Sequence, residues 1–404
     1  MRYGSGEILE IDFPSDAQIS SGPGNDHNPL SDVVAAVTVA VCEPLGYPPL
    51  CECVVPGDQV AVVLDEAVPH VSAILTGILH ELIKAGVSPA SCTVVCTIAH
   101  RDRVAEIKEQ LPDWAREVPI VVHDPIAKKY LSYLAASEDG AAIYFNRTIA
   151  DADFVVPIAA IRSEDAHDYF GIHTSLFPAF ADDSSQRRFY SREVDNSTKH
   201  RKESRKETNE AAWLLGIQFT VQVIPGAGSS ILHVLAGQAE EVYQQGRALS
   251  NSAWRCDFPS RADLVLAGIE GGAEQQTWAS LARALEAACQ VVTEHGTIVL
   301  CTELGSLPGP ALQRLSGVSG GLSHTLHAIG EEPAFDCSPA AIVAVARERA
   351  RIFLLSQLNE ETVEDLGFGF VAHAGEINNL LRAQKSCILL PNAQNVAVDV
   401  EEIQ

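Results

Sequence analysis

The sequence is poor in basic residues, in cysteine and in long apolar runs, and each shortage excludes a class of protein. Its 404 residues hold 28 Lys and Arg against 53 Asp and Glu, a formal net charge of −25. Such a chain repels nucleic acid and anionic membranes, so we expect neither as a partner. Ten cysteines are too few for a disulfide scaffold, and no run reaches the ~18 apolar residues of a membrane span. We therefore expect a reduced, cytoplasmic protein.

Apolar strand-like segments alternate with helix-like segments along most of the chain. Residues 58–66 (DQVAVVLDE) and 92–99 (CTVVCTIA) favour buried strands, and residues 71–87 between them have the periodicity of a helix. A strand at 262–269 followed by a helix at 277–292 restarts the pattern. This alternation predicts an α/β fold with largely parallel sheets that are covered on both faces.

A segment rich in Ser, Pro and Asp at residues 250–263 separates the two halves and suits a linker. We therefore expect two α/β domains, residues 1–255 with the catalytic histidines and residues 256–404 closing the cleft between them. Whether the last strand returns to the first domain stays open.

Two shorter segments carry their own predictions. Residues 338–358 (SPAAIVAVARERARIFLLSQL) read as one long helix. The glycine-rich residues 225–230 (PGAGSS) follow a predicted strand but lack the Gly-Lys-Ser/Thr of a phosphate loop, so we expect a hairpin turn.

Polar side chains follow three predicted strands directly. Asp65 ends the first, His100 follows the second, and His167 follows a third strand at residues 153–161. Ligands of parallel sheets collect at the carboxyl ends of the strands. A single histidine there is more often a helix cap or a hydrogen-bonded surface residue. Two at equivalent positions favour an acid/base pair, because imidazole titrates near neutral pH.

Two other regions have the composition of a binding site. Between Arg187 and Lys206 the chain carries eight basic and three acidic residues, which suits either a solvated loop or a clamp for phosphate or carboxylate. Glycines at 268, 271 and 272 lie between a predicted strand and a predicted helix. We therefore expect Gln275, Gln276 and Trp278 to lie in the cleft.

The order of segments resembles the nickel-dependent lactate racemase family. The resemblance rests on VAVVLDEAVP, TIAHR, AHDYFG followed by SLFPAF, NEAAWLLGIQFTVQVI and ADLVLAGIEGG. It implies two α/β domains around an interdomain active site and a nickel-pincer nucleotide as cofactor. It also implies racemisation or epimerisation of a 2-hydroxy acid by reversible hydride transfer. Cofactor biosynthesis and loading proteins are the expected partners, and the chain is expected to be a monomer or homodimer.

The resemblance also assigns roles to residues. It implies that His100 and His167 exchange protons on opposite faces of the substrate. The cofactor would be bound by Asp65, Thr174, Ser175, Arg187, Arg188 and Trp278. The substrate would be contacted by Arg101, Tyr169, Gln275 and Gln276, and the nickel by His200 or His173.

Three departures from the family pattern stand out. The family arginine three residues after the aspartate is Val68 here, and the lysine that tethers the cofactor is Thr174. A lysine near the start of the second-domain helix is also missing around residues 274–276. We therefore expect a non-covalent cofactor. The alternatives are an epimerase or redox enzyme for a bulkier hydroxy compound, such as a sugar acid, and a non-catalytic cofactor-binding homologue.

Overall fold

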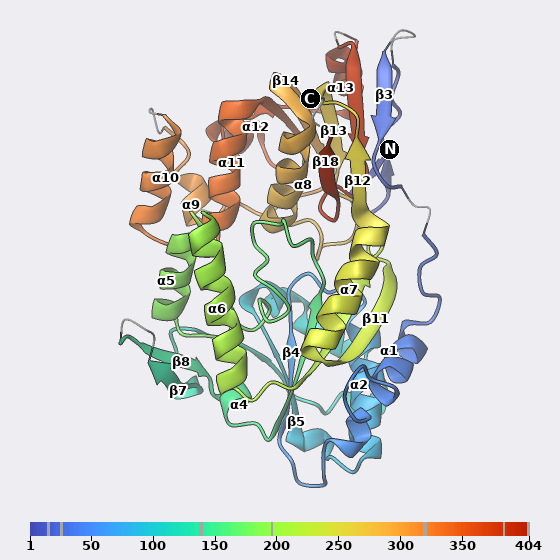
Figure 1. Ribbon diagram of the computed structural model, residues 1–404, viewed down its shortest axis with the longest axis vertical. Helices are drawn as coiled ribbons and strands as arrows, with labels where there is room; N and C mark the ends of the chain where they lie inside the picture. Colours follow the sequence, from blue (N-terminus) through green and yellow to red (C-terminus); the bar gives the residue numbers. More distant parts are fainter. Residues whose placement is uncertain are drawn as a thin grey trace.

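Two six-stranded sheets form the frame of the chain in the computed structural model, one above the other in Figure 1. The structure describes residues 1–13, 17–24, 27–136, 140–194, 197–317, 321–382 and 384–401. Helices cover both sheets. The predicted fold class, two α/β domains with largely parallel sheets, is confirmed.

The first sheet is parallel except for one antiparallel edge strand. Its strands, in spatial order, are β11 (Ile231–Gln238), β10 (Phe219–Pro225), β9 (Phe154–Ala160), β4 (Val60–Leu64), β5 (Cys92–Cys96) and β6 (Ile120–Val122). All five residues of β4 are buried, as expected for a central strand with both faces covered. Val62 packs on the side of α1 (Val33–Cys42) and α2 (Val71–Lys84). Val63 packs on the side of α5 (Asp183–Glu193) and α6 (Thr198–Leu214).

The second sheet is parallel throughout. Its strands, in spatial order, are β16 (Gly369–Phe370), β15 (Arg351–Leu355), β14 (Val292–Cys301), β13 (Ala262–Gly268), β17 (Ser386–Leu390) and β3 (Gln18–Ser21). On one face Val265 packs with α8 (Trp278–Val291) and α11 (Cys337–Arg349). On the other face Leu266 packs with α13 (Ala374–Leu381).

Both ends of the described chain lie in the upper domain of Figure 1. Near the N-terminus, β3 pairs with β17 of the second sheet, a pairing that the sequence analysis did not predict. Near the C-terminus, β18 (Ala397–Val400) pairs in parallel with β12 (Arg255–Phe258). The chain therefore starts in the second sheet, builds the first, and then returns.

The remaining elements lie outside the two sheets or connect their strands. The helices are α3 (Val104–Gln110), α4 (Arg147–Ala150), α7 (Ala239–Trp254), α9 (Pro310–Gln313), α10 (Leu322–Glu331) and α12 (Glu360–Asp365). The 3₁₀ helices are η1 (Leu50–Glu52), η2 (Pro89–Ser91), η3 (Ile98–Arg103), η4 (Asp113–Ala115) and η5 (Lys128–Tyr130). Two small antiparallel pairs are β1 (Arg2–Tyr3) with β2 (Glu7–Ile8) and β7 (Leu131–Ala136) with β8 (Ala142–Asn146).

The prediction of one long helix at residues 338–358 is wrong. Helix α11 ends at Arg349, and β15 begins two residues later and pairs with β14. The segment Arg351–Leu355 (RIFLL) combines a β-branched and an aromatic residue, which suit a strand, and pairing with a central strand overrides the helical continuation. The hairpin predicted at residues 225–230 is confirmed, since the Gly226 amide donates to the Ser230 carbonyl at 2.8 Å.

Among the helices of the described residues, none has both the length and the apolar character that a membrane crossing needs.

Candidate active site

The carboxyl ends of three adjacent strands of the first sheet carry ionisable side chains. Asp65 follows β4, His100 lies in η3 directly after β5, and Arg162 lies two residues beyond β9. The order β9-β4-β5 places these three chain segments next to one another. Asp65, His100 and Arg162 therefore lie at one edge of the sheet, and Arg162 is not among the residues predicted from the sequence.

His100 is buried without a hydrogen-bond partner. It is 1% exposed, and neither Nδ1 nor Nε2 has a partner among the described residues. Burial lowers its pKa to about 4, Arg103 lowers it further, and Asp65 opposes the shift. The imidazole is therefore neutral at pH 7. Each buried polar atom without a hydrogen-bond partner lowers the stability of the fold by about 1–3 kcal/mol. Such atoms are therefore rare in proteins, and a site that binds a ligand is one place where they occur.

His167 is fixed through its backbone. The side chain is 4% exposed, and the backbone N–H donates to Oε2 of Glu286 on α8 at 3.1 Å. Arg201 on α6 donates to the carbonyl oxygens of Glu164, Ala166 and His167 at 3.0, 3.1 and 3.2 Å. These bonds hold the segment after β9 against a helix from each domain.

Four charged side chains of alternating sign connect the surroundings of the two histidines. Arg162 lies 3.2 Å from Asp65 and 3.5 Å from Asp168, and Arg283 of α8 lies 2.6 Å from Asp168. Burial alone would lower the pKa of Arg162, but Asp65 and Asp168 together raise it. Burial would likewise raise the pKa of Asp168, but Arg283 and Arg162 hold it below its usual value. Arg162 and Asp168 are therefore both charged at neutral pH.

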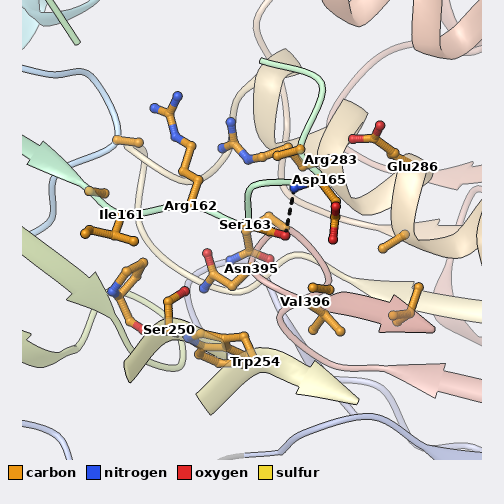
Figure 2. Close-up of a pocket in the computed structure, with 18 of the residues that line it drawn as sticks. Ile161, Arg162, Ser163, Asp165, Ser250, Trp254, Arg283, Glu286, Asn395 and Val396 are labelled. Atoms are coloured by element: carbon orange, nitrogen blue, oxygen red, sulfur yellow. Dashed lines mark hydrogen bonds between the residues drawn. The ribbon is translucent and has the colours of Figure 1, made fainter. Parts of the chain in front are cut away.

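A pocket between the domains lies beside this chain of charges (Figure 2). Figure 2 shows the guanidinium groups of Arg162 and Arg283 on the same side of the segment that carries Ser163. The lining residues labelled there include Asp165, Trp254, Glu286 and Asn395. Burial raises the pKa of Glu286 to about 7 even though the His167 amide donates to it. Neither His100 nor His167 is among the described residues that line this pocket.

The predicted residues of the second domain have specific contacts. Gln275 is 3% exposed, and its amide reaches the carbonyl oxygen of Ala67 at 3.5 Å, across the domain interface. The Gln276 side chain instead binds the backbone at the ends of β13 and β14, donating to Gly271 O at 3.0 Å and accepting from Glu303 N at 2.8 Å. Trp278 donates to the carbonyl oxygen of Ser306 at 3.0 Å. Gln276 and Trp278 thus hold loops of their own domain.

The turn after β9 holds three of the predicted residues. Thr174 Oγ1 donates to Gly171 O at 2.8 Å and accepts from Phe170 N at 2.9 Å, so its hydroxyl closes the turn. Ser175 is buried, and its Oγ has no partner among the described residues. Burial lowers the pKa of His173 to about 4.

Three predicted residues remain, namely the substrate candidates Arg101 and Tyr169 and the nickel candidate His200. Arg101 is exposed, whereas Arg103 of the same 3₁₀ helix reaches Glu274 of the second domain at 3.7 Å. Tyr169 is 5% exposed, and its hydroxyl has no partner among the described residues. His200 lies in the first turn of α6, where its backbone N–H donates to Ser197 Oγ at 3.3 Å.

Most described residues of the basic segment 187–206 lie in helices α5 and α6, and the arginines of this segment have partners in two different regions. Arg187 pairs with Asp183 at 2.9 Å, and Arg188 pairs with Glu207 at 2.6 Å. Both predicted cofactor arginines therefore have carboxylate partners in their own domain. Arg201 instead contacts the segment that carries His167. Asp195, counted in the charge of this segment, lies outside the described residues.

Four residues of this region were not predicted from the sequence: Arg162, Asp168, Arg283 and Glu286. Arg162 follows an apolar strand almost directly, so the rule that selected Asp65 and His100 would have found it too. Arg283 and Glu286 are the charged residues of α8, and they occur three residues apart. That spacing places two charges on one helix face, and charges on a buried face need partners.

The donor groups in this region suit a nickel nucleotide that is held without a covalent bond. His100 and His173 are neutral at pH 7, and neutral imidazole is the form that binds metals. The Thr174 hydroxyl offers no amine, and no lysine occurs between Asp151 and Lys199. The described residues contain no group of three His, Cys, Asp or Glu side chains arranged to hold a metal.

Comparison with known proteins agrees with the sequence resemblance. Residues 3–201 match the family model of the lactate racemase N-terminal domain. The chain superposes on the lactate racemase apoprotein from Thermoanaerobacterium thermosaccharolyticum with a TM-score of 0.80 at 18% identity, over 98% of this chain and 99% of that one. It superposes on a Thermotoga maritima protein, solved by the Northeast Structural Genomics Consortium, with a TM-score of 0.68 at 13% identity, over 94% and 100%.

No curated protein sequence matches the chain. At identities below 20% the two superpositions show a shared fold alone, and the family is carried by the match over residues 3–201. Residues 3–201 therefore belong to the lactate racemase N-terminal domain family.

Proposed function

We propose that this protein is a racemase or epimerase of a 2-hydroxy acid that uses a non-covalently held nickel-pincer nucleotide. The observation that carries the proposal is His100, a buried neutral imidazole with two unpaired nitrogens at the carboxyl edge of a lactate racemase-like domain. When bound, the nickel nucleotide supplies the acceptor and donor of hydride. His173 or His200 would provide the imidazole that holds the nickel.

His100 takes the proton from the substrate 2-hydroxyl in one direction of the reaction. A neutral imidazole can accept a proton, and its position beside Asp65 stabilises the resulting positive charge. His167 acts on the opposite face, where its backbone N–H donates to Glu286 and its carbonyl oxygen accepts from Arg201. Each histidine returns the proton when the reaction runs in the other direction.

Arg162 binds the substrate carboxylate in this proposal. The family arginine near the first strand end is Val68, which is 0% exposed and packs in the core. Arg162 presents a guanidinium to the same strand end through its 3.2 Å contact with Asp65, and it lines the interdomain pocket. Guanidinium binds carboxylate through two parallel hydrogen bonds, so this position can replace the missing anchor.

The test is racemisation by the cofactor-loaded protein with a panel of single-enantiomer 2-hydroxy acids. We expect His100→Ala and His167→Ala each to lower the rate by about 10²-fold or more in both directions, because each direction needs one base and one acid. Near-normal racemisation by either variant would refute its role.

A second candidate is an epimerase or redox enzyme for a bulkier hydroxy compound such as a sugar acid. Val68 favours it, because an apolar residue replaces a long polar one near the strand end. Sugar acids in the same panel separate the two candidates. No turnover of any hydroxy acid by loaded protein would favour a non-catalytic, cofactor-binding protein instead.

Cofactor biosynthesis and loading proteins are the partners that this proposal requires. Co-expression with such proteins should be needed before nickel co-purifies with the chain.

A further inference from the structure

The structure assigns a second ligand site, for a monocarboxylate with an apolar tail, to a cavity within the first domain. This cavity lies between the hairpin of β7 and β8 and the helices α5 and α6, on the left of Figure 1. Its volume is about 340 Å³. A cavity of about 150 Å³ can hold one benzene molecule, so this one has room for a larger aromatic acid.

The cavity is separate from the candidate active site. None of its described lining residues follows β4, β5 or β9, the strands whose carboxyl ends carry Asp65, His100 and Arg162. None of them comes from the second domain either. The inference therefore does not depend on the proposed function.

The hairpin supplies an apolar wall. The pairing of β7 with β8 shifts in register between Tyr133 and Ala135, so Leu134 is an extra residue in its strand. Such a bulge breaks the strict alternation of side chains, and Leu134, Ala135 and Ala136 all line the cavity. Since the two alanine side chains are short, they leave the space in front of the hairpin unfilled.

One face of α6 forms the opposite wall. Its lining residues recur at intervals of one helical turn: Glu203, Lys206, Glu207, Glu210, Ala211 and Leu214. The charged residues come first along this face and the apolar residues come last, so the wall changes from polar to apolar along the helix. A ligand that is charged at one end and apolar at the other matches this division.

Two arginines of α5 share one carboxylate at the charged end of the cavity. Arg188 donates to Oε1 of Glu207 at 2.6 Å, and Nη2 of Arg192 lies 2.6 Å from Oε2 of the same residue. All three side chains are less than a quarter exposed. Two guanidinium charges against one carboxylate leave a net positive charge beside the cavity.

The other charged residues of the lining do not cancel this excess. Glu203 lies 3.8 Å from Lys199, which is not among the described lining residues. Lys206 and Glu210 contribute one charge of each sign. One positive charge therefore remains, and a ligand with a single negative charge would balance it.

Arg188 also keeps one donor without an acceptor. Its Nε is buried and has no hydrogen-bond partner among the described residues. Buried donors normally have a partner. A carboxylate in the cavity would accept this bond, because carboxylate and guanidinium form short, charge-assisted hydrogen bonds. The apolar tail of the same molecule would then lie against the hairpin.

Titration calorimetry with the full-length chain, purified without cofactor, tests the site. The probes are 3-phenylpropionate, its uncharged amide 3-phenylpropionamide, and propionate. We expect 3-phenylpropionate to bind and the other two to bind at least about 10-fold more weakly, because the amide lacks the charge and propionate lacks the ring. No binding of 3-phenylpropionate at millimolar concentration would refute the site. Equal affinity for the acid and its amide would refute the selection of a carboxylate.

Variants locate the binding. Arg188→Gln removes the guanidinium with the unpartnered Nε, and Ala135→Leu fills the cavity without changing a charge. Each should weaken 3-phenylpropionate binding by about 10-fold or more. Arg187→Gln is the matched control and should leave binding unchanged, because Arg187 lies on the same helix, pairs with Asp183 and is not among the described lining residues. Circular dichroism and thermal melting verify that each variant is folded.

Arg162→Lys separates this cavity from the interdomain pocket. Arg162 lines that pocket and offers a carboxylate probe another place to bind. Binding of 3-phenylpropionate that is unchanged in Arg162→Lys supports the cavity of the first domain. Binding that is lost in Arg162→Lys but retained in Arg188→Gln and Ala135→Leu would assign the probe to the interdomain pocket and overturn the inference.

Discussion

The guanidinium group of Arg283, on α8 of the second domain, lies 2.6 Å from Oδ2 of Asp168, on the segment that follows β9 of the first domain. Asp168 is also the neighbour of His167 in the sequence. One ion pair therefore joins the two domains next to a proposed catalytic residue, so that the domain interface and the segment that carries His167 share this contact.

Removal of this interdomain ion pair should be costly. We expect Arg283→Met to lower the free energy of unfolding by about 3–5 kcal/mol, because Asp168 would keep a buried charge with Arg162 alone at 3.5 Å. Chemical denaturation measures the loss. In the double variant Arg283→Met/Asp168→Asn the loss should be smaller than the sum of the two single losses.

The control for that experiment is an exposed pair of the same chemistry. Arg187→Met breaks the i,i+4 pair with Asp183, in which both side chains are about half exposed, and should cost less than about 0.5 kcal/mol. Equal losses of unfolding free energy for Arg283→Met and Arg187→Met would show that the interdomain pair stabilises the protein no more than an exposed pair does.

Glu286 should make the stability of the protein depend on pH in a defined window. Its pKa is about 7 when folded and near 4.5 when unfolded, so the unfolded chain releases this proton first as pH rises. The ionisation of Glu286 therefore lowers the free energy of unfolding as pH rises from about 4.5 to 7. Above pH 7 it lowers this free energy no further. Glu286→Gln should be more stable than the natural protein above pH 7, by up to about 3 kcal/mol, and similar to it below pH 4.5.

Urea denaturation at pH 4.5, 6 and 8 checks this dependence on pH. Glu294→Gln serves as the control, because the Glu294 side chain is 88% exposed. A stability difference between Glu286→Gln and the natural protein that is constant across this range would refute the raised pKa.

The acid limb of the pH–rate profile should report His100. Its pKa of about 4 lies below the usual 6.5, and a base must be neutral to accept a proton. We expect kcat/KM for a 2-hydroxy acid to stay level down to about pH 5 and to fall as pH drops through about 4. Circular dichroism over the same range separates unfolding from titration. A limb near pH 6.5 would argue against His100 as the base.

Arg162 should control the binding of the substrate carboxylate. We expect Arg162→Lys to raise KM by about 10-fold or more while the protein stays folded, since an ammonium keeps the charge opposite Asp65 and Asp168 but loses the two parallel hydrogen bonds. Steady-state kinetics and thermal melting measure the two effects separately. An unchanged KM for the carboxylate substrate would remove Arg162 from the site.

The intact mass of the loaded protein tests the missing tether. The Thr174 hydroxyl is used within its own turn, so we expect denaturing mass spectrometry to give the unmodified chain. Native mass spectrometry of the same sample should show nickel and nucleotide bound together. A covalent addition under denaturing conditions would refute non-covalent binding.

Local sequence patterns determined the fold class and the positions of Asp65 and His100. Short apolar runs such as Val60–Leu64 favour buried strands, and the first polar residue after such a strand lies at the edge of the sheet. The same patterns misplaced the end of α11, because only the pairing of β15 with β14 makes Arg351–Leu355 a strand.

Tertiary structure alone decided which charged side chains meet. Arg283 is 115 residues from its partner Asp168, and Arg162 is 97 residues from Asp65. The local sequence around a charged residue does not show which distant residue it will contact. For the same reason, the sequence allowed all basic residues of segment 187–206 to be assigned to one anion clamp. Folding divides it, with Arg187 and Arg188 satisfied by nearby carboxylates and Lys202 and Arg205 left at a pocket. Ion pairs between the domains depend on contacts between distant elements, whereas strands and helices follow from the periodicity of neighbouring residues.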